Sequence, residues 1–358
     1  MSAPRSLLAR VALFVALVAF VLPTAALAGG KQQSGTYRQE NLVSDIPGVA
    51  DITDPDLVNP WGLAAGAKTP LWVADNGTDK STIYPGGTKQ TLISKAQLVV
   101  DIPGGAPTGA VYNPTDEFKL GNTGPALFLF SSEAGQITAW NMAAGTSAQS
   151  VFTAPDGAIY KGLTLASTKK SGPLIYATDF HNGKVDVFDG SFAPVHMSGA
   201  FTDPNIPAGF APFGIQEIGG FVVVSYAKQD ADREDDVKGP GLGFVDVYTP
   251  TGSLVKRLIS DGELNAPWGL VLAPSDFGKF SGDLLVGNFG DGRINAYNPH
   301  TGDLLGQLQT KFGPITIDGL WGLRFGNGVT GTPRTLLFSA GIVDEAHGLL
   351  GEIKARRH

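Results

Sequence analysis

The sequence contains no cysteine among its 358 residues. Disulfide bonds, thiol catalysis, iron–sulfur clusters and cysteine zinc sites are therefore excluded. Histidine is also scarce, with five residues. Only His181 and His347 fall in the turns considered below, so a zinc site of three histidines would need its third ligand from elsewhere. The fold must rest on burial, and a chain of this length buries about three quarters of the surface that its unfolded form exposes.

Two catalytic motifs are lacking as well. No G-x-S-x-G sequence is present, which excludes the nucleophile turn of serine hydrolases. The glycine-rich "GDGRIN" at residues 290–295 has the residues of a tight hairpin turn, in which Asp-Gly accepts positive φ, and does not resemble a phosphate loop.

Positive charge is in short supply. The chain has 26 Lys and Arg residues against 33 Asp and Glu, a formal net charge of −7. Residues 1–28 hold two of the arginines and no acidic residue, so without them 24 basic residues face 33 acidic ones and the charge is −9. Binding to nucleic acid depends on neutralising phosphates, and no basic tract is present. We therefore expect no nucleic-acid partner.

The N-terminus has the pattern of a secretory signal peptide. Arg5 and Arg10 precede an apolar run at residues 11–22, and Ala-Leu-Ala follows at 26–28. The run is shorter than the roughly 20 residues that span a bilayer, although an uncleaved membrane anchor is the alternative. The sequence predicts a signal peptide over residues 1–28, one domain over 29–358, no membrane span after cleavage, and a secreted or periplasmic protein.

A repeat of about 50 residues fills the remaining chain. Trp-Gly-Leu occurs at Trp61, Trp268 and Trp321, and aligning the chain on its glycine reveals three further units. The aligned glycines are Gly62, Gly109, Gly162, Gly214, Gly269 and Gly322, at intervals of 47, 53, 52, 55 and 53 residues. Each unit continues with an apolar strand such as "LWVAD" at 71–75, a turn, and an alternating strand such as "GRINAY". Weaker fourth strands follow, as in "TLISK" at 91–95 and "RLISD" at 257–261.

Six units of four strands predict an all-β, six-bladed β-propeller. The sixth unit ends after its third strand, whereas the N-terminal "YRQENLVSDI" has no unit of its own. We therefore expect this N-terminal strand to complete the last blade. Each tryptophan of Trp-Gly-Leu is expected to start an innermost strand and to pack between blades, where an aromatic ring buries a large area. Contact with a ligand is the alternative role.

One face of this propeller is expected to collect polar residues. The loops before each innermost strand and the turns between second and third strands lie on that face, around the mouth of the central channel. The predicted channel-mouth residues are Asn59, Asp75, Asn76, Glu133, Asp179, His181, Asn288, Asp291, Asp318 and His347. The same loops and turns also contain Asp51, Asp54, Asp56, Asp344 and Glu345.

Carboxylate and amide oxygens are the donors that Ca²⁺ prefers. Asp75, Asn76, Asn288 and Asp318 are the predicted ligands of such an ion, although Asp and Asn are also common in turns for local reasons. Asp179 and His181 are candidates for an acid–base pair, a role in which His is the commonest residue. The alternative is a hydrogen bond within their own turn.

The fourth unit carries an acidic insertion in the same turn, "SYAKQDADREDDVKGPGLG" at residues 225–243. It contains Asp230, Asp232, Glu234, Asp235 and Asp236, without the full spacing and glycine of an EF-hand loop. The sequence leaves two interpretations open: a solvated surface loop, or a flap beside the channel mouth that calcium orders.

Several long segments resemble a family of secreted bacterial proteins of uncharacterised function. These are "NPWGLA", "ATDFHNGKVDVFDG", "NAPWGLVLAPSDFGKFSGDLLVGNFGDGRINAYNP", "IDGLWGLRFGNG" and "DEAHGLLGEI", together with the segment around the acidic insertion, and the resemblance covers residues 37–354. It implies an NHL-like six-bladed propeller. Some members carry a C-terminal PEP-CTERM sorting segment, which "IKARRH" does not match. The architecture is also similar to calcium-dependent lactonases that bind a metal at the channel mouth, although no motif aligns with theirs.

Two functions remain open at this point. The first is an extracytoplasmic binding or scaffold protein that presents the channel-mouth face to a small molecule, a glycan or another protein. The second is a Ca²⁺-dependent hydrolase that acts on a small ester, lactone or sugar acid at the same mouth. A redox enzyme with a quinone cofactor is a weaker third possibility.

Overall fold

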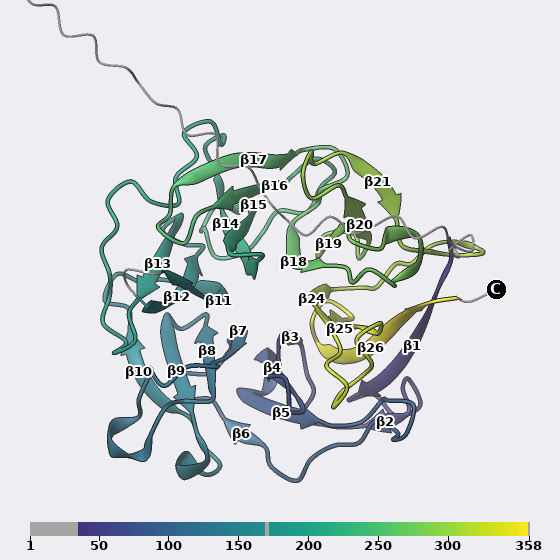
Figure 1. The fold of residues 1–358 in the computed structure, drawn as a ribbon, viewed down its shortest axis with the longest axis horizontal. Helices are drawn as coiled ribbons and strands as arrows, with labels where there is room; N and C mark the ends of the chain where they lie inside the picture. Colours follow the sequence, from purple (N-terminus) through teal and green to yellow (C-terminus); the bar gives the residue numbers. More distant parts are fainter. Residues whose placement is uncertain (1–34, 169–171, 357–358) are drawn as a thin grey trace, which may run out of the picture.

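The computed structural model describes residues 35–168 and 172–356 of the chain. Six β-sheets stand in a ring around a central axis (Figure 1), which confirms the six-bladed propeller that the repeat predicts. The predicted signal peptide lies outside the described residues. No helix in the part of the chain that the structure describes is long and apolar enough to cross a membrane.

The blades follow one another along the chain, and each begins with its innermost strand. Blade 1 contains β3 (Pro60–Ala64), β4 (Leu71–Asp75), β5 (Lys80–Tyr84) and β6 (Val100–Asp101). Blade 2 contains β7 (Pro107–Tyr112), β8 (Phe128–Ser132), β9 (Gln136–Trp140) and β10 (Gln149–Thr153). Blade 3 contains β11 (Tyr160–Thr168), β12 (Gly172–Asp179) and β13 (Lys184–Phe188).

The second half of the ring continues in the same order. Blade 4 contains β14 (Phe210–Ile218), β15 (Phe221–Lys228), β16 (Phe244–Tyr248) and β17 (Leu254–Ser260). Blade 5 contains β18 (Pro267–Leu272), β19 (Leu284–Asn288), β20 (Ile294–Tyr297) and β21 (Leu304–Gln307). Blade 6 contains β24 (Leu320–Phe325), β25 (Leu336–Ile342), β26 (His347–Ala355) and, from the N-terminus, β1 (Tyr37–Ser44) with β2 (Ile52–Thr53) beside it.

Short elements decorate the loops between these strands. A small hairpin, formed by β22 (Gln309–Thr310) and β23 (Gly313–Pro314), connects blade 5 to blade 6. The 3-10 helices are η1 (Asn76–Thr78), η2 (Gly121–Thr123), η3 (Met142–Ala144) and η4 (Gly278–Phe280).

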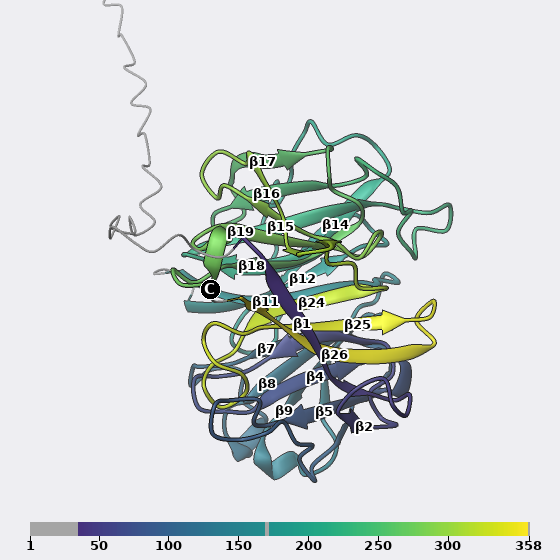
Figure 2. The same cartoon turned by 90° about the vertical axis from the view of Figure 1, so that its right-hand side faces the viewer.

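The N-terminal strand closes the ring, as the sequence predicts. β1 pairs antiparallel with β26, from Tyr37 opposite Ala355 to Ser44 opposite Leu349. Figure 2 shows β1 crossing the outer side of the ring beside β26. His347 adds a polar contact to this closure, because its Nδ1 lies 2.6 Å from Oδ2 of Asp45, directly after β1.

The aligned glycines allow the inner strands to touch. A Cβ atom on Gly62 would lie 2.5 Å from the carbonyl oxygen of Thr108 in the next blade, and one on Gly214 would lie 2.0 Å from that of Trp268. A Cβ atom on Gly322 would lie 2.5 Å from the carbonyl oxygen of Trp61, which closes the circle. Only glycine permits such close approach of two backbones, so the repeat of this residue records a repeated contact between blades.

Separate apolar cores fill the spaces between neighbouring blades. For example, Trp72 of blade 1 packs on Phe128 of blade 2, with ring centroids 4.2 Å apart. Val73 of blade 1 and Leu337 of blade 6 share another core with Leu42 and Val43 of β1. The closing strand is therefore held by side-chain burial as well as by its backbone.

Two details differ from the predicted strands. Residues 91–95 form no strand, and the fourth strand of blade 1 is the short β6; Lys95 instead pairs with Asp54 and Asp56. Blade 3 has three strands, because the chain after β13 turns away at Asp189 and returns only as far as a hydrogen bond from Val195 N to Val187 O. A groove of about 580 Å³ lies along this edge, lined by residues that include Phe152, Val185 and Met197.

Candidate functional site at the channel mouth

An aromatic cluster closes the channel at one end of the axis. It consists of Trp61, Phe180, Phe213, Trp268, Phe289 and Trp321, which come from five of the six blades. Trp61 and Trp321 are stacked with ring centroids 3.5 Å apart, and Phe289 stacks on Trp321 at 3.9 Å. The three Trp-Gly-Leu tryptophans therefore start inner strands as predicted, but they meet one another at the axis rather than packing in separate interfaces between blades.

The channel beyond this cluster is narrow. Its cavity has a volume of about 40 Å³ and is lined by inner-strand residues such as Gly62, Leu163 and Gly269. That volume holds ordered water but no larger molecule. A ligand on the axis must therefore bind at the mouth, where the polar side chains gather.

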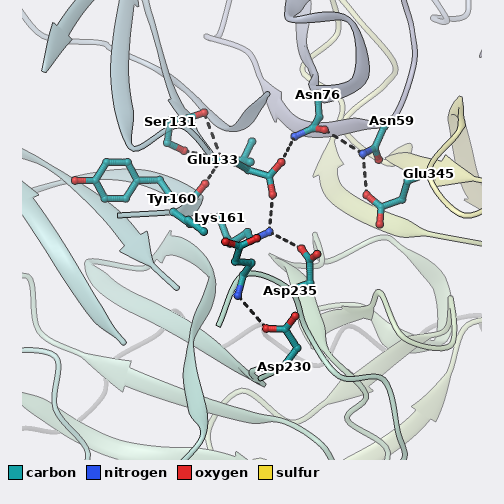
Figure 3. A network of polar contacts seen from close by, with 12 residues as sticks. Asn59, Asn76, Ser131, Glu133, Tyr160, Lys161, Asp230, Asp235 and Glu345 are labelled. Carbon is teal, nitrogen blue, oxygen red and sulfur yellow. Dashed lines mark hydrogen bonds and ion pairs between the residues drawn. The ribbon is translucent and has the colours of Figure 1, made fainter. Parts of the chain in front are cut away.

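Six polar side chains form an open arc of hydrogen bonds next to the aromatic cluster, which we call the mouth ring (Figure 3). Asn59 donates from Nδ2 to Oε2 of Glu345 (2.7 Å) and to Oδ1 of Asn76 (3.2 Å). Asn76 donates in turn to Oε2 of Glu133 at 2.9 Å. Nζ of Lys161 then donates to Oε1 of Glu133 at 2.5 Å and to Oδ1 of Asp235 at 3.1 Å. The mouth ring thus joins blades 6, 1, 2, 3 and 4.

The mouth ring is anchored to the aromatic cluster below it. Trp321 donates from Nε1 to Oδ1 of Asn59 at 3.1 Å, and Trp268 donates from Nε1 to the carbonyl oxygen of Lys161 at 2.9 Å. The indole N–H of Trp61 is buried without a hydrogen-bond partner among the described residues. Two of the three tryptophans therefore position the polar groups of the mouth.

Lys161 is the least expected member of the mouth ring, because its side chain is only 2% exposed. Burial on its own would lower the pKa of this ammonium group, but the Glu133 and Asp235 carboxylates outweigh burial and raise it. Its Nζ also lies 5.3 Å from the ring centroid of Trp61. Lys161 is therefore a permanent positive charge at the centre of the mouth.

The acidic insertion folds over one side of the mouth. It is held by backbone hydrogen bonds from Asp230 N to Asp235 O and from Val237 N to Lys228 O, and by Asp230 Oδ1, which accepts from Glu234 N at 3.0 Å. Asp235 reaches Lys161 although its side chain is 76% exposed, and Asp232 and Glu234 are exposed as well. These contacts order the insertion through the protein's own groups. Calcium binding by the insertion stays a prediction.

Asp236 turns its carboxyl group inward from the insertion. Its Oδ2 is buried and has no hydrogen-bond partner among the described residues. Burial raises the pKa of Asp236 to about 7; Lys238 and Lys161 oppose this shift, whereas Glu345 and Asp235 add to it. Asp236 therefore keeps its proton to a higher pH than an ordinary aspartate does.

A strained turn presents Glu345 to the mouth. Val343, Asp344 and Glu345 are consecutive and have φ values of 57°, 49° and 64°. The left-handed conformation costs roughly 1–2 kcal/mol per non-glycine residue, so other contacts must hold it. Asp318 does so, because its Oδ2 accepts from Val343 N at 2.7 Å. Burial raises the pKa of Glu345, and the hydrogen bond from Asn59 opposes that shift.

The other predicted channel-mouth residues lie outside the mouth ring. Asp75 is fully buried and accepts from Thr82 N at 2.8 Å, and burial raises its pKa well above the usual value. Asn288 donates to Glu263 O at 2.7 Å and to Asp291 Oδ1 at 3.1 Å, within its own blade. These three residues fix the loops of their blades.

The two predicted histidines are not joined to the mouth ring. Asp179 accepts from Asn182 N at 3.1 Å and from Asn182 Nδ2 at 2.8 Å, which is the bond within the turn that the sequence leaves open. His181 has a buried Nδ1 without a hydrogen-bond partner among the described residues. His347 binds Asp45 at the closure of the ring, as described above.

The predicted calcium ligands have separate partners in this structure. Asn76 belongs to the mouth ring, Asp75 and Asp318 accept backbone N–H groups, and Asn288 keeps one buried oxygen, Oδ1, without a partner. Within residues 35–168 and 172–356, no group of three or more His, Asp or Glu side chains is placed to hold a metal ion. Calcium binding at the mouth stays a prediction.

One member of the mouth ring, Lys161, escaped the sequence prediction. Glu345 lies in one of the turns that were expected on this face, together with Asp344. Lys161 precedes the aligned Gly162, at the position that Trp61, Trp268 and Trp321 occupy in their units. Four of the other five units have an aromatic residue at this position and the fifth has Thr108, so a charged side chain there is a signal that the alignment contained.

Comparisons with known proteins place the chain in a family. No family model matches it. The uncharacterized protein R648 of Acanthamoeba polyphaga mimivirus is 32% identical over 343 residues, which cover 91% of this chain and 82% of the viral protein. The uncharacterized protein L690 of the same virus is 32% identical over 308 residues, which cover 82% and 80%.

Two solved structures share the fold. A gluconolactonase from Xanthomonas campestris has a TM-score of 0.54 and 12% identity, with coverage of 90% of this chain and 91% of its own. A streptogramin B lyase has a TM-score of 0.52 and 13% identity, with coverage of 91% and 100%. Identities this low show the fold alone, which is a six-bladed propeller.

The relatives found by sequence are viral, so the comparisons do not support the bacterial origin or the PEP-CTERM segment that the resemblance implies. They do agree with the expectation of a six-bladed propeller family whose activity is uncharacterised. Both viral proteins exceed 30% identity and are matched over four fifths of their length. The chain therefore belongs to the family of the uncharacterized mimivirus proteins R648 and L690.

Proposed function

We propose that the protein is a binding protein whose channel mouth takes a small polar ligand. The observation that supports this most directly is the mouth ring, in which five blades contribute amides, carboxylates and a buried lysine beside stacked aromatic rings. Binding sites commonly combine a largely preformed apolar surface with a few fixed polar groups. The ring residues hold one another in place, so little ordering would be needed when a ligand binds.

A thermal-shift screen of sugars, amino acids, small organic acids and short peptides tests this proposal. Compounds that raise the melting temperature are then titrated while tryptophan fluorescence is followed, because Trp61, Trp268 and Trp321 lie at the mouth. Glu345→Gln should weaken binding about tenfold. Glu40→Gln, on the outermost strand β1, is the matched control and should bind as the wild type does. Ligands that bind both variants equally, or no ligand in any class, would count against a site at the mouth.

A Ca²⁺-dependent hydrolase is the second candidate, and Asp236 favours it. A carboxyl group with a pKa of about 7, next to Lys161 and Glu345, is able to exchange protons at neutral pH. Two solved structures with TM-scores above 0.5 are named as a gluconolactonase and a lyase, which makes a small lactone or ester a reasonable substrate to test. Calcium would be held by side-chain oxygens of the mouth and would polarise a carbonyl oxygen.

Metal analysis and an activity panel separate the two candidates. The hydrolase requires calcium in the purified protein, a lower melting temperature after chelation, and turnover of a lactone or aryl ester. Asn288→Ala should then abolish turnover, because Asn288 is a predicted ligand with an unpartnered Oδ1. Absence of turnover across the panel, with no effect of the chelator, would leave the binding protein as the better proposal.

We propose that the protein is exported from the cytoplasm. The pattern of residues 1–28 supports export, and the acidic charge of the chain suits a partner other than nucleic acid. Expression with the native N-terminus in a secreting host, followed by mass measurement, tests the cleavage after residue 28. A full-length mass in the membrane fraction would support the uncleaved anchor instead.

A further inference from the structure

One sector of the mouth contains a buried polar atom, Oδ2 of Asp236, that forms no hydrogen bond with the mouth ring. This sector is formed by Asp236 and Lys238 of the acidic insertion, by Glu345 of the β25–β26 turn, and by Phe289 after β19. Asp236 Oδ2 is buried without a hydrogen-bond partner in the described part of the chain. Nζ of Lys238 lies 4.3 Å from the ring centroid of Phe289, and the ion pairs described for the protein do not include it. We call these four residues the open sector.

Aromatic faces in this region already attract ammonium groups. Lys238 lies over Phe289, and Lys161 lies over Trp61 at 5.3 Å. Phe289, Trp321 and Trp61 form a continuous stack, with neighbouring centroids 3.9 and 3.5 Å apart. The face of an aromatic ring is negative and binds cations more strongly when water is excluded. Lys238 is exposed on the surface of the insertion, so a competing cation can replace it more readily than it can replace the buried Lys161.

The charge at the mouth also favours a cation. Among the described residues, four carboxyl groups, those of Glu133, Asp235, Asp236 and Glu345, lie near the two ammonium groups of Lys161 and Lys238. Asp230, Asp232 and Glu234 lie close by on the insertion, with Arg233 as their counter-charge. A net negative mouth concentrates cations and repels anions. A buried carboxyl oxygen with no partner adds a direct reason, because a cation would supply the missing interaction.

We propose that the open sector binds the ammonium group of a small ligand, which takes the place of Lys238 over Phe289 and pairs with Asp236 and Glu345. This inference rests on the proposed binding function and names the chemical class of its ligand. The ammonium group belongs either to an alkyl amine, such as a lysine side chain, or to an amino sugar. Both present the same charge to the same carboxylates.

Binding of a cation in the open sector should depend on pH. Asp236 has a pKa of about 7, set by burial and by Lys238, Lys161, Glu345 and Asp235 around it. An ammonium group binds the ionised form better, so affinity should increase as the pH rises from 6 to 8. Asp236→Asn is neutral throughout and should remove that dependence. A ligand that accepts a hydrogen bond from the protonated carboxyl group of Asp236 would instead lose affinity as the pH rises from 6 to 8.

A matched series of probes tests the charge of the ligand. 1,5-Diaminopentane, 1,5-pentanediol and glutarate have the same number of carbons and carry positive, zero and negative charge. Isothermal titration of each into the full chain should show saturable binding of the diamine alone. Glucosamine and glucose form a second pair, and whichever amine binds more tightly identifies the source of the ammonium group.

Variants of the open sector sharpen the test. Asp236→Asn and Phe289→Leu should each weaken diamine binding about tenfold. Lys238→Met should strengthen it several-fold, because it removes the ammonium group that competes from within the protein. Asp232→Asn, on the exposed part of the same insertion, should bind as the wild type does. Equal melting temperatures for the four variants establish that each has folded.

The outcomes separate this inference from the proposed function. Equal binding of the diamine and the diol, tighter binding of glutarate, or weaker diamine binding by Lys238→Met would overturn the ammonium site. If both amines fail to bind at millimolar concentration while a neutral compound from the screen binds, the inference fails and the binding function stands. If neither the amines nor any compound of the screen binds, both fail.

Discussion

Nζ of Lys161 lies 2.5 Å from Oε1 of Glu133, and this ion pair joins the inner strand of blade 3 to the β8–β9 turn of blade 2. The lysine side chain is 2% exposed and the glutamate side chain 28%. Removal of one partner leaves a charge that water solvates only in part, so the pair is expected to matter more than a surface ion pair.

Lys161→Met should lower the free energy of unfolding by about 2 kcal/mol, which is below the full cost of an unpaired buried charge because Glu133 is partly solvated. Lys161→Met combined with Glu133→Gln should recover part of that loss. Urea unfolding measures both. Lys184→Met, which breaks ion pairs of a lysine that is 42% exposed, is the control and should cost less than about 1 kcal/mol. A loss as small for Lys161→Met as for Lys184→Met would show that the buried ion pair of Lys161 and Glu133 does not stabilise the fold.

Gly214→Ala should destabilise the ring severely. The added Cβ atom would lie 2.0 Å from the carbonyl oxygen of Trp268, and neither backbone is free to move without disturbing the next blade. We expect a loss of about 3 kcal/mol or more, the upper end for overpacking. Gly35→Ala is the control, since its nearest neighbour is a lysine side-chain carbon 3.9 Å away. A melting temperature unchanged by Gly214→Ala would refute the contact between inner strands.

Val343→Gly should stabilise the protein. Val343 has a φ of 57°, which a β-branched residue adopts at a cost and glycine adopts freely. Relief of this strain should raise the free energy of unfolding by about 1 kcal/mol, measured from the urea midpoint. Val49→Gly, at a half-exposed turn position without positive φ, should be neutral or slightly destabilising. Equal losses in the two variants would mean that the turn at Val343 stores no strain.

Because of Asp246, the free energy of unfolding should decrease as the pH rises from 4 to 7. It is fully buried in blade 4, and burial followed by the nearby Asp203 carboxylate raises its pKa to about 7. The folded protein therefore keeps a proton that the unfolded chain releases at about pH 4, so the free energy of unfolding decreases as the pH rises through this window and levels off above it. Asp246→Asn should remove this contribution, which urea unfolding at pH 5 and pH 8 detects.

Asp189→Asn is the control for that experiment, because the pKa of Asp189 shifts the other way. Burial opposes the shift, but hydrogen bonds from Ser191 and from the backbone of Ala193 lower the pKa below its usual value. Its stabilising effect is lost only as the pH falls below about 4. The difference in stability between pH 5 and pH 8 should therefore match that of the wild type. The same difference in Asp246→Asn would show that Asp246 does not titrate in this range.

The fold was predictable because its cause is repeated along the chain. Each aligned glycine lies at a backbone contact between inner strands. The turns between second and third strands all lie on one face of the propeller. The closing strand was predictable because "YRQENLVSDI" has no unit of its own and the sixth unit lacks a fourth strand. Val43 of this segment is buried in the core between blades 6 and 1. Blade 3 differs because nothing in a repeat reveals that the chain after Asp189 turns away from the sheet edge.

The candidate site was predictable only as a face. Asn59, Asn76 and Glu133 meet there because turns from neighbouring blades converge, which six-fold symmetry implies. Their partners are decided by contacts across the ring that no local pattern encodes: Lys161 reaches Glu133, and the turn of Glu345 depends on Asp318. The residue type of Asp179 was not enough to predict its role, because Asn182 donates a hydrogen bond to its carboxylate within the same turn.

The closure by β1 also has a kinetic consequence. Most strand pairs join residues that are close in the sequence, whereas Tyr37 pairs with Ala355. Blades 1 to 5 can therefore form as synthesis proceeds, but blade 6 remains incomplete until β26 has been made. Pairing over such a distance pays a large loop-closure entropy and is slow. During that interval the edge of β26 is exposed, and any second chain that offers a strand there competes with β1 for it.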